Sequence, residues 1–338
     1  MSKKGERKCI YVYADWKELA GPKFMGTMSV DFVRGAEVFS FDYDKAWLAG
    51  EYGQQLDPEL QLYVGPQFLT EGKSNFGVFL DSCPDRWGRG LMDRREVILA
   101  KEEKRTPRKL CESDYLLGVF DGHRMGALRY KLDPNGDFLN NNRDFTSPPW
   151  ARLRELEQAS LKLEEERTEN SKEYLKWINM LMSPGSSLGG ARPKASVIDE
   201  KGNLWIAKFP SCKDDSDIGG WEMVAHLMAL DAGIEMGECK VQKFNSPHYT
   251  FMTKRFDRDR ESTRIHFASA MTCLGKVDGA GASTGESYLD IAAFIATNGN
   301  QVNSDLEELW RRIVFSICIS NVDDHLRNHG FILTKKGW

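Results

Sequence analysis

The chain has 338 residues, which corresponds to two domains on a prior of about 150 residues per domain. Lys and Arg number 46 and Asp and Glu number 50, so the formal net charge is −4, and 41% of the residues are hydrophobic. This composition excludes a disordered chain, which combines low hydrophobicity with high net charge. It also argues against nucleic-acid binding driven by the charge of the whole chain.

Cysteine usage and hydropathy indicate the cellular compartment. The cysteines are widely spaced, odd in number and contain no Cys-x-x-Cys pair, which indicates neither a disulfide framework nor a zinc site; they are Cys9, Cys83, Cys111, Cys212, Cys239, Cys273 and Cys318. The apolar run over residues 9–14 stops at Asp15 and is too short for a signal peptide. No run of about 18 uncharged apolar residues predicts a membrane-spanning helix. We therefore expect a reduced, cytoplasmic protein.

Residues 1–135 are expected to form a mixed strand and helix subdomain. Hydrophobic alternation with period two predicts strands over residues 9–14 and 37–43. Residues 86–109 hold nine basic and four acidic residues, which is typical of a solvated helix face; a surface for phosphate or for an acidic partner is the alternative. The dense turn residues of segment 136–149 predict a linker.

Residues 150–338 are expected to form the second domain, in which helices accompany a hairpin. The apolar patterns predict, in chain order, helices within 153–163 and 174–181, a hairpin of 195–198 and 204–209, a helix over 221–228, a strand over 251–253 and an apolar helix over 306–317. Ser304 and Glu307 form the pattern of a capping box ahead of that last helix. The predicted fold class is therefore α+β.

A glycine-rich segment precedes the predicted hairpin. Residues 184–194 contain three glycines and two serines, and such a segment can present several backbone N–H groups to one anion because glycine tolerates positive φ. It differs from a P-loop, since Ala191 stands at the position of the P-loop lysine and a strand pattern follows in place of a helix. From this segment alone, a phosphate cradle and a flexible linker are both open.

A lysine and a glutamate follow the glycine-rich segment. Alternation along the second strand of the hairpin places Lys208 on the same face as Leu204 and Ile206. An ammonium on an apolar face is costly unless it is paired or lies at the mouth of a cleft; the alternative is that Lys208 begins the exposed end of the strand. Glu222, at the start of the next predicted helix, is the expected partner of Lys208, and the alternative is a residue that complements the helix dipole.

A polar loop directly follows the apolar helix. Asp323 and Asn328 have the Asp-x-x-x-x-Asn spacing of a kinase catalytic loop, in which the aspartate accepts the proton of the substrate hydroxyl and the asparagine holds Mg²⁺. In such a chain this spacing arises by chance on the order of once. We expect His325 to be a structural residue of the loop, and Asp324 either to face solvent or to lie beside a metal.

The order of these parts is more informative than any one of them. A glycine-rich loop, a strand lysine, a helix glutamate and a polar loop follow one another as in protein kinases, which use them to bind and transfer a γ-phosphate. Four motifs resemble those of the HipA-type serine/threonine kinases, toxins of bacterial toxin–antitoxin systems, and lie at residues 187–194, 206–210, 255–258 and 323–328. Three further segments resemble the N-terminal subdomain of that family, at residues 80–89, 114–118 and 125–129.

The resemblance spans roughly residues 26–333 and implies a two-lobed, protein-kinase-like HipA fold, with a small mixed N-terminal domain and a larger helical C-terminal domain. It implies that Ser187 is the serine that such kinases phosphorylate on themselves. The nucleotide-binding residues that it implies are Gly189, Gly190, Ala191, Lys194, Lys208, Lys254 and Phe256.

Further roles follow from the same resemblance. Lys208 is expected to bind the phosphates with Glu222 as its partner, and Asp323 is expected to be the catalytic base and Asn328 a Mg²⁺ ligand. ATP and Mg²⁺ are therefore the expected cofactors. Known members phosphorylate an aminoacyl-tRNA synthetase, stop translation and are restrained by a small DNA-binding antitoxin, so we expect a protein substrate, contact with DNA only through an antitoxin, and no membrane partner.

One departure from the family pattern concerns the metal site. The family has a second metal-binding aspartate on a strand shortly after the catalytic loop, whereas residues 330–334 predict a strand here and no aspartate follows Asp324. We therefore expect either a truncated chain or impaired phosphate transfer. The alternative function is a kinase-like binding module that engages an antitoxin, and a more distant one is an ATP-grasp or sugar-kinase-like enzyme.

Overall fold

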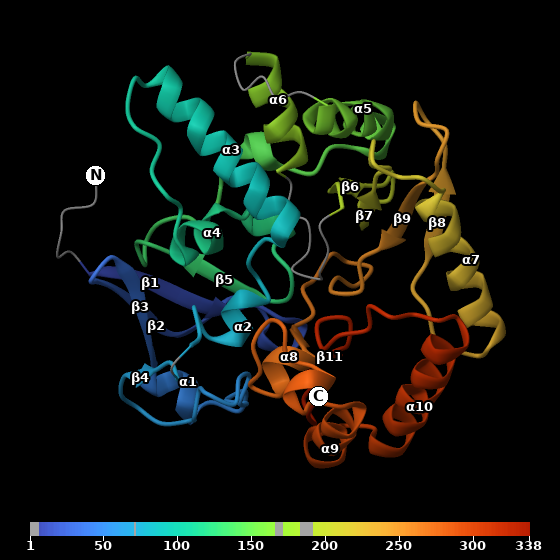
Figure 1. Cartoon of the computed structure of the whole chain (residues 1–338). Helices are drawn as coiled ribbons and strands as arrows, with labels where there is room; N and C mark the ends of the chain where they lie inside the picture. Colours follow the sequence, from blue (N-terminus) through green and yellow to red (C-terminus); the bar gives the residue numbers. More distant parts are fainter. Residues whose placement is uncertain (1–6, 71, 166–171, 183–191) are drawn as a thin grey trace.

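The computed structural model describes residues 7–70, 72–165, 172–182 and 192–338 (Figure 1). The strands are β1 (Lys8–Ala14), β2 (Lys23–Val33), β3 (Ala36–Tyr43), β4 (Gln67–Phe68), β5 (Leu128–Lys131), β6 (Lys194–Ile198), β7 (Leu204–Lys208), β8 (Cys239–Gln242), β9 (Thr250–Lys254), β10 (Phe267–Ser269) and β11 (Gly330–Ile332). The α-helices are α1 (Lys45–Ala49), α2 (Gly77–Leu80), α3 (Arg86–Glu102), α4 (Glu112–Gly118), α5 (Leu153–Glu165), α6 (Lys172–Leu181), α7 (Ile218–Asp231), α8 (Ala270–Cys273), α9 (Tyr288–Asn298) and α10 (Val302–Cys318). This mixture confirms the predicted α+β class.

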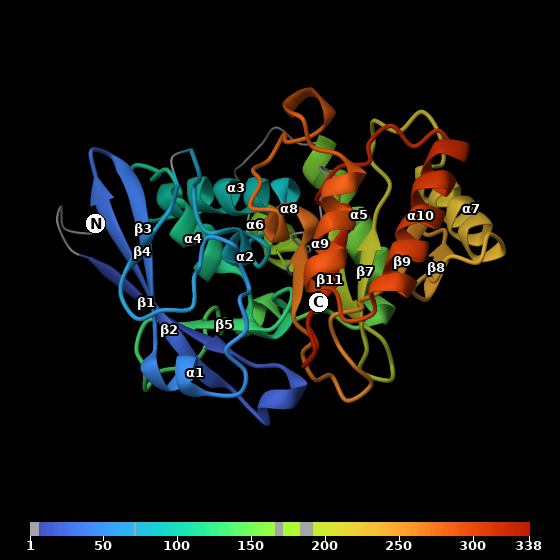
Figure 2. The ribbon, with the colours of Figure 1, turned by 90° about the horizontal axis from the view of Figure 1, so that it is seen from below.

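The N-terminal half, residues 7–149, is built on an antiparallel sheet with the strand order β4-β3-β2-β1-β5 (Figure 2). The two strands predicted by alternation are confirmed as β1 and β3. Ile10, Val12 and Ala14 of β1 have no exposed surface, because alternate residues of a strand point to one face of the sheet. That face packs against Phe76 and Phe79 at α2, and together these side chains form the first hydrophobic core.

The C-terminal half, residues 150–338, begins with helices α5 and α6 and an antiparallel sheet of order β6-β7-β9-β8. The predicted hairpin is confirmed as β6 and β7, and Gly202 in its turn has a φ of +80°, where a side chain would be strained. Trp205 of β7 is 1% exposed and lies in a second core shared by this sheet and its covering helices.

The second core crosses the predicted linker. Leu91 and Ile98 of α3, which belong to the N-terminal half, pack in the same core as α5 and α6. The segment 136–149 is itself packed, since Leu139 pairs with β5 and Phe145 is buried. One hydrophobic core therefore contains residues from both sides of the predicted linker. The domain boundaries stay a prediction from the sequence.

The last elements, α8, α9, α10 and the β10–β11 pair, enclose a third core around Ile291, Ile295 and Leu309. The predicted capping box is wrong. The helix begins at Val302 with Gln301 as its N-cap, because the Asp305 N–H donates to the Gln301 carbonyl and carries the helix back beyond Ser304.

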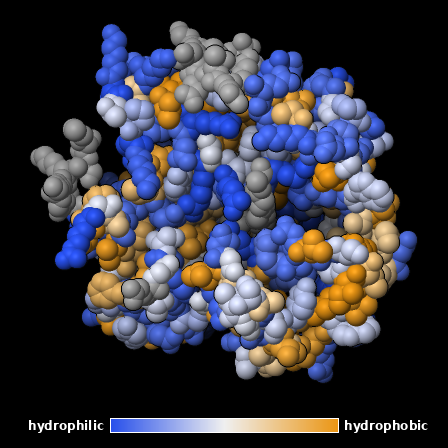
Figure 3. Space-filling view, viewed as in Figure 1, coloured by the Kyte–Doolittle hydropathy of each residue, from blue (hydrophilic) through white to orange (hydrophobic). Residues whose placement is uncertain are grey.

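Apolar side chains on α7 and α10 are more exposed than their helical stripes predict. Trp310 is 64% exposed and Ile317 is 71% exposed on α10, and Trp221 is 64% exposed on α7. Figure 3 shows hydrophobic surface at the lower right, over the position of α10 and α7 in Figure 1. Among the described residues no helix has the length and apolarity needed to cross a membrane.

The two halves are joined by polar contacts as well as by apolar packing. Asp81, at the end of α2, accepts hydrogen bonds from the backbone N–H and the hydroxyl of Ser269, at 2.7 and 2.8 Å. Ser269 is the N-cap of α8 in the C-terminal half. Lys73 also donates to the Gly275 carbonyl at 2.7 Å, and Leu333 packs in the first core.

Because Asp81 is buried, its pKa rises from 3.8 to about 6, although hydrogen bonds from Ser269 oppose this. The folded state thus retains the proton to higher pH than the unfolded state, so stability falls as pH rises from about 4 to about 6. The shift corresponds to roughly 3 kcal/mol. We predict that Asp81→Asn removes this pH dependence, because its amide can accept from Ser269 and donate to the Thr272 hydroxyl. Urea unfolding between pH 4 and pH 7 tests this, and an unchanged slope in the variant would contradict it.

Candidate active site

Lys208 and Glu222 form the ion pair expected from their order in the sequence. Lys208 ends β7, and its Nζ lies 2.6 Å from Oε2 of Glu222 on α7. The ammonium also lies 5.4 Å from the centre of the Phe251 ring. The two charged side chains are 36% and 27% exposed, so the pair lies at the surface of the sheet, where an anion can reach the ammonium.

The position of Glu222 follows from how α7 packs on the sheet. The helix starts at Ile218, with Asp217 as N-cap accepting from the Gly220 N–H, so Glu222 lies in the second turn and does not open the helix. A Cβ on Gly219 would lie 2.0 Å from the Tyr249 carbonyl oxygen, so only glycine permits this approach to β9. The close packing brings the helix glutamate within reach of the strand lysine.

The predicted phosphate-binding segment lies mostly outside the described residues, and this includes Ser187, Gly189, Gly190 and Ala191. Lys194 is described and belongs to β6 and not to the loop in which it was expected. Its buried ammonium forms an ion pair with Asp85, the N-cap of α3. Burial raises the pKa of Asp85, and the charge of Lys194 opposes this. A nucleotide phosphate would therefore compete with a buried carboxylate for this lysine.

Lys254 and Phe256 lie where β9 leaves the sheet. The Lys254 N–H donates to the Glu238 carbonyl at 2.9 Å, and its Nζ lies 3.9 Å from the carboxylate of the same residue. Phe256 is 43% exposed, and its ring centre lies 5.2 Å from that of Phe267. The backbone here is fixed, while the aromatic ring remains open to solvent on one side.

The loop that joins α10 to β11 carries Asp323 and Asn328, and both residues are exposed. The Asn328 amide nitrogen donates to the Asp323 carbonyl at 2.7 Å, and the Asn328 N–H donates to the His325 carbonyl at 2.8 Å. The Asp-x-x-x-x-Asn spacing thus closes a compact loop. Within the described ranges no hydrogen bond engages the Asp323 carboxylate, so both of its oxygens are open to a ligand.

The Asp324 side chain points into the protein and fixes the loop. This corrects the expectation that Asp324 faces solvent and the expectation that His325 is the structural residue of the loop. Its carboxylate accepts a hydrogen bond from the Tyr288 hydroxyl at 2.7 Å and contacts His329 Nε2 at 2.9 Å, so it does not face solvent. The imidazole that fixes the loop is His329, whereas the His325 side chain is exposed. Burial alone would raise the pKa of Asp324, but the hydrogen bonds from His329 and Tyr288 lower it overall. Burial and this carboxylate raise the pKa of Tyr288 to about 12.

A cavity of about 710 Å³ connects the loop with the end of β9. Of the predicted site residues, Phe256 and Asn328 line it, whereas Lys208, Lys254 and Asp323 lie outside its lining. Its walls combine apolar side chains with charged ones, namely Ile291, Ile295, Leu309, Asp305, Glu308, Arg312 and Arg327 among others.

The donors fit a metal ion that is held mainly by phosphates. The described residues contain no group of three or more His, Cys, Asp or Glu side chains arranged for a metal. Asn328 can offer its side-chain oxygen, since its amide nitrogen is occupied by the loop. Mg²⁺ keeps several waters and commonly takes few protein ligands together with substrate phosphates. This loop is therefore compatible with Mg²⁺ bound to ATP.

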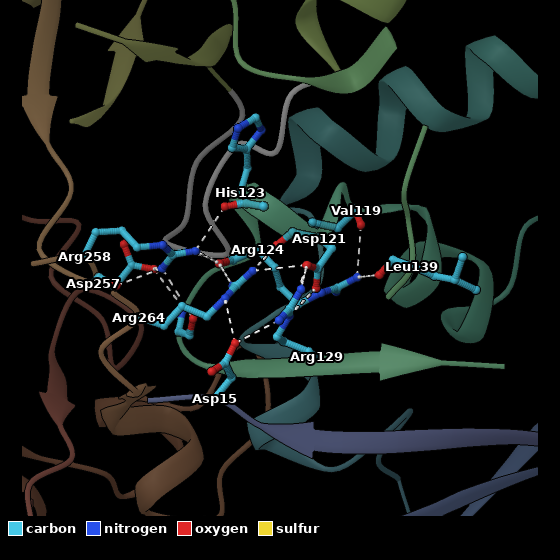
Figure 4. A network of polar contacts seen from close by, with 12 residues as sticks. Asp15, Val119, Asp121, His123, Arg124, Arg129, Leu139, Asp257, Arg258 and Arg264 are labelled. Atoms are coloured by element: carbon cyan, nitrogen blue, oxygen red, sulfur yellow. Dashed lines mark hydrogen bonds and ion pairs between the residues drawn. The ribbon is translucent and has the colours of Figure 1, made fainter. Parts of the chain in front are cut away.

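A buried network of arginines and aspartates lies beside the end of β9, and the sequence interpretation gave its members no role (Figure 4). Arg255 and Asp257 have no exposed side-chain surface and form an ion pair at 2.6 Å. The network continues through Arg258 and Arg264 to Asp121 and includes Arg124, Arg129 and Asp15. The sequence feature that could have indicated this network is the charged run at residues 255–258, which immediately follows a largely buried strand.

Comparisons with known proteins show what this chain is similar to. Residues 186–338 match the family model of the HipA-like C-terminal domain. A curated relative from Haemophilus influenzae, named "Putative kinase", is 28% identical over an alignment of 169 residues. The alignment covers 45% of this chain and 49% of the relative, so the chain spans about half the length of that relative. The solved HipA of Shewanella oneidensis MR-1, in a complex with HipB and operator DNA, matches with a TM-score of 0.61 and 17% identity, and covers 97% of this chain and 73% of that chain. Residues 186–338 therefore resemble the HipA-like C-terminal domain in sequence, and the fold of nearly the whole chain resembles that of a solved HipA.

Proposed function

We propose that this chain is a HipA-like serine/threonine kinase that transfers the γ-phosphate of ATP to a protein hydroxyl. The observation that carries the proposal is the Lys208–Glu222 ion pair, with Nζ 2.6 Å from Oε2 across β7 and α7. Kinases use a strand lysine held by a helix glutamate to bind nucleotide phosphates. The family match of residues 186–338 and the relative named as a kinase support the same activity.

Each part of the site then has a task. ATP supplies the phosphoryl group, and Mg²⁺ neutralises charge on its phosphates. Lys208 binds the phosphates, while Lys254 and Phe256 border the adenine. The exposed Asp323 carboxylate accepts the proton of the attacking hydroxyl as the new O–P bond forms and the bond to the β-phosphate oxygen breaks. Asn328 offers its side-chain oxygen to Mg²⁺.

The proposal extends to the glycine-rich segment. Gly189, Gly190 and Ala191 cradle phosphates with their backbone N–H groups, and Lys194 follows them. Ser187 is the autophosphorylation site. A phosphate on it adds about −1.5 to −2 charges at pH 7, in the region proposed for the phosphates of ATP, so the modification opposes nucleotide binding.

The proposed partners follow from the family. The Shewanella neighbour was solved with HipB and operator DNA, and we extend this to a small DNA-binding antitoxin that restrains the present chain and links it to DNA. The proposed substrate is a protein of the translation machinery in the cytoplasm, such as an aminoacyl-tRNA synthetase. A kinase-like module that binds an antitoxin without transferring phosphate is the competing function.

Lys208→Ala is expected to weaken binding of the ATP analogue AMP-PNP with Mg²⁺ by tenfold or more, because the ammonium that meets the phosphates is removed. A tenfold loss corresponds to about 1.4 kcal/mol. The fold should change little, since a partly exposed ion pair contributes only about 0–1 kcal/mol. Calorimetric titration measures the affinity, with Lys201→Ala in the hairpin turn as a matched control. Equal affinity of both variants and the original chain would refute the role of Lys208.

Asp323→Asn is expected to lower the rate of phosphate transfer by about 10²–10⁴-fold, because the amide cannot accept the hydroxyl proton. Nucleotide affinity should remain unchanged. The assay follows transfer from radiolabelled ATP and maps phosphate on Ser187 by mass spectrometry. Asp278→Asn is the control, since Asp278 is also exposed. Its carboxylate lies 3.6 Å from Arg327, which belongs to the loop that carries Asp323. Transfer that survives in the Asp323 variant contradicts the assignment, and a chain that binds an antitoxin but never transfers phosphate supports the competing function.

A further inference from the structure

The run from Arg255 to Arg258 inverts the usual burial of residue types. Charged Arg255 and Asp257 have completely buried side chains, whereas the aromatic Phe256 between them is 43% exposed. Charged side chains are almost never fully buried unless they are paired, and large aromatic ones normally are buried. The two buried charges therefore hold the aromatic residue out toward the cavity that it lines.

The contacts of Arg255 reach the N-terminal half. Its Nη1 donates to the His123 carbonyl at 2.6 Å, and its Nη2 donates to the Arg124 carbonyl at 3.3 Å. The same guanidinium donates from Nε and Nη2 to the two oxygens of Asp257, at 2.8 and 2.6 Å. One planar group thus ties the chain on both sides of Phe256 to the short turn at residues 121–124.

Asp257 completes the attachment from the other side. It accepts from the Gly126 N–H at 2.8 Å and from Arg258 Nη1 at 2.8 Å. Burial alone would raise the pKa of Asp257, but the charges of Arg255 and Arg258 lower it to about 2, so the carboxylate stays ionised. Figure 4 shows Asp257 and Arg258 facing Arg124 and His123 across the boundary between the halves.

The backbone around Phe256 is fixed at both ends. The Arg255 N–H donates to the Leu204 carbonyl at 2.9 Å, and the Ile265 N–H donates to the Asp257 carbonyl at 3.0 Å. Buried ion pairs are weak evidence for added stability, because desolvation offsets their attraction. The contacts of this pair instead restrict the positions that the residues between and beside it can take.

We propose that the buried Arg255–Asp257 pair is a positioning device, by which the N-terminal half sets the place of Lys254 and Phe256 at the nucleotide site. The proposal rests on the proposed function, since these two residues matter to nucleotide only if the chain binds it. Arg255 and Asp257 act through their neighbours and do not themselves touch the nucleotide.

The test replaces the planar guanidinium by an ammonium. Arg255→Lys keeps the charge, but a single ammonium cannot make the four contacts of the guanidinium to oxygen atoms. We expect hydrogen exchange at residues 254–258 to accelerate tenfold or more and the dissociation constant for AMP-PNP with Mg²⁺ to rise about tenfold. Arg129→Lys is the matched control, because Arg129 lies in the same network but bonds Asp15 and Asp121 and not the 254–258 segment. Arg129→Lys should lower the melting temperature to a similar extent as Arg255→Lys. It should leave hydrogen exchange at residues 254–258 and the dissociation constant for AMP-PNP unchanged.

The outcomes separate the two proposals. Wild-type exchange at residues 254–258 in Arg255→Lys overturns the positioning role, and so does an affinity loss that is equal in Arg129→Lys. If the original chain does not bind AMP-PNP, the proposed function fails and the exchange measurement alone decides the positioning role. If Arg255→Lys does not fold, Arg258→Lys is measured in its place, because Arg258 bonds Asp257 from the opposite side.

Discussion

The contact between the two halves depends on the ionised carboxylate of Asp257. It is fully buried, and it stays charged because two guanidiniums and the Gly126 N–H surround it. Arg258 needs the carboxylate in turn, since burial lowers the pKa of Arg258 to about 10 and the charge of Asp257 opposes this. Removing one member of such a group leaves an uncompensated buried charge, which typically costs 3–5 kcal/mol. Neither half can satisfy these groups alone.

Further polar contacts cross the boundary between the two halves. The N-terminal half supplies carbonyls and the Asp121 and Asp81 carboxylates, and the C-terminal half supplies arginines and the N-cap Ser269. Ser269 leads into α8, whose first N–H groups donate to the carbonyls of His329 at 2.8 Å and Leu326 at 3.2 Å. The loop that carries Asp323 is therefore attached, through α8, to a residue of α2. Both the end of β9 and this loop take their positions from the half that lies outside the matched C-terminal domain.

Local sequence patterns predicted most helices and strands. They did not predict which distant residues form polar pairs. The hairpin and the Lys208–Glu222 pair were predictable because their residues lie within one strand–turn–strand–helix segment and obey its periodicity. The pairing of Lys194 with Asp85 joins residues 109 positions apart, and that of Asp257 with Gly126 joins residues 131 apart. No spacing rule encodes such partners. The capping box at Ser304 failed for another reason, because helix propagation back to Val302 satisfied the N–H groups that the cap would have served.

The loop after α10 shows how neighbouring polar residues acquire different tasks. Asp323 and Asp324 are adjacent, yet the first is exposed and the second is held by Tyr288 and His329. A buried carboxylate must be hydrogen-bonded, and once it is, its oxygens are no longer free for a substrate. The exposed neighbour keeps its oxygens free but depends on a rigid backbone for its position. The inward-facing pair of Asp324 and His329 supplies that rigidity to the outward-facing pair of Asp323 and Asn328, so the loop combines residues that fix its backbone with residues that remain open to solvent.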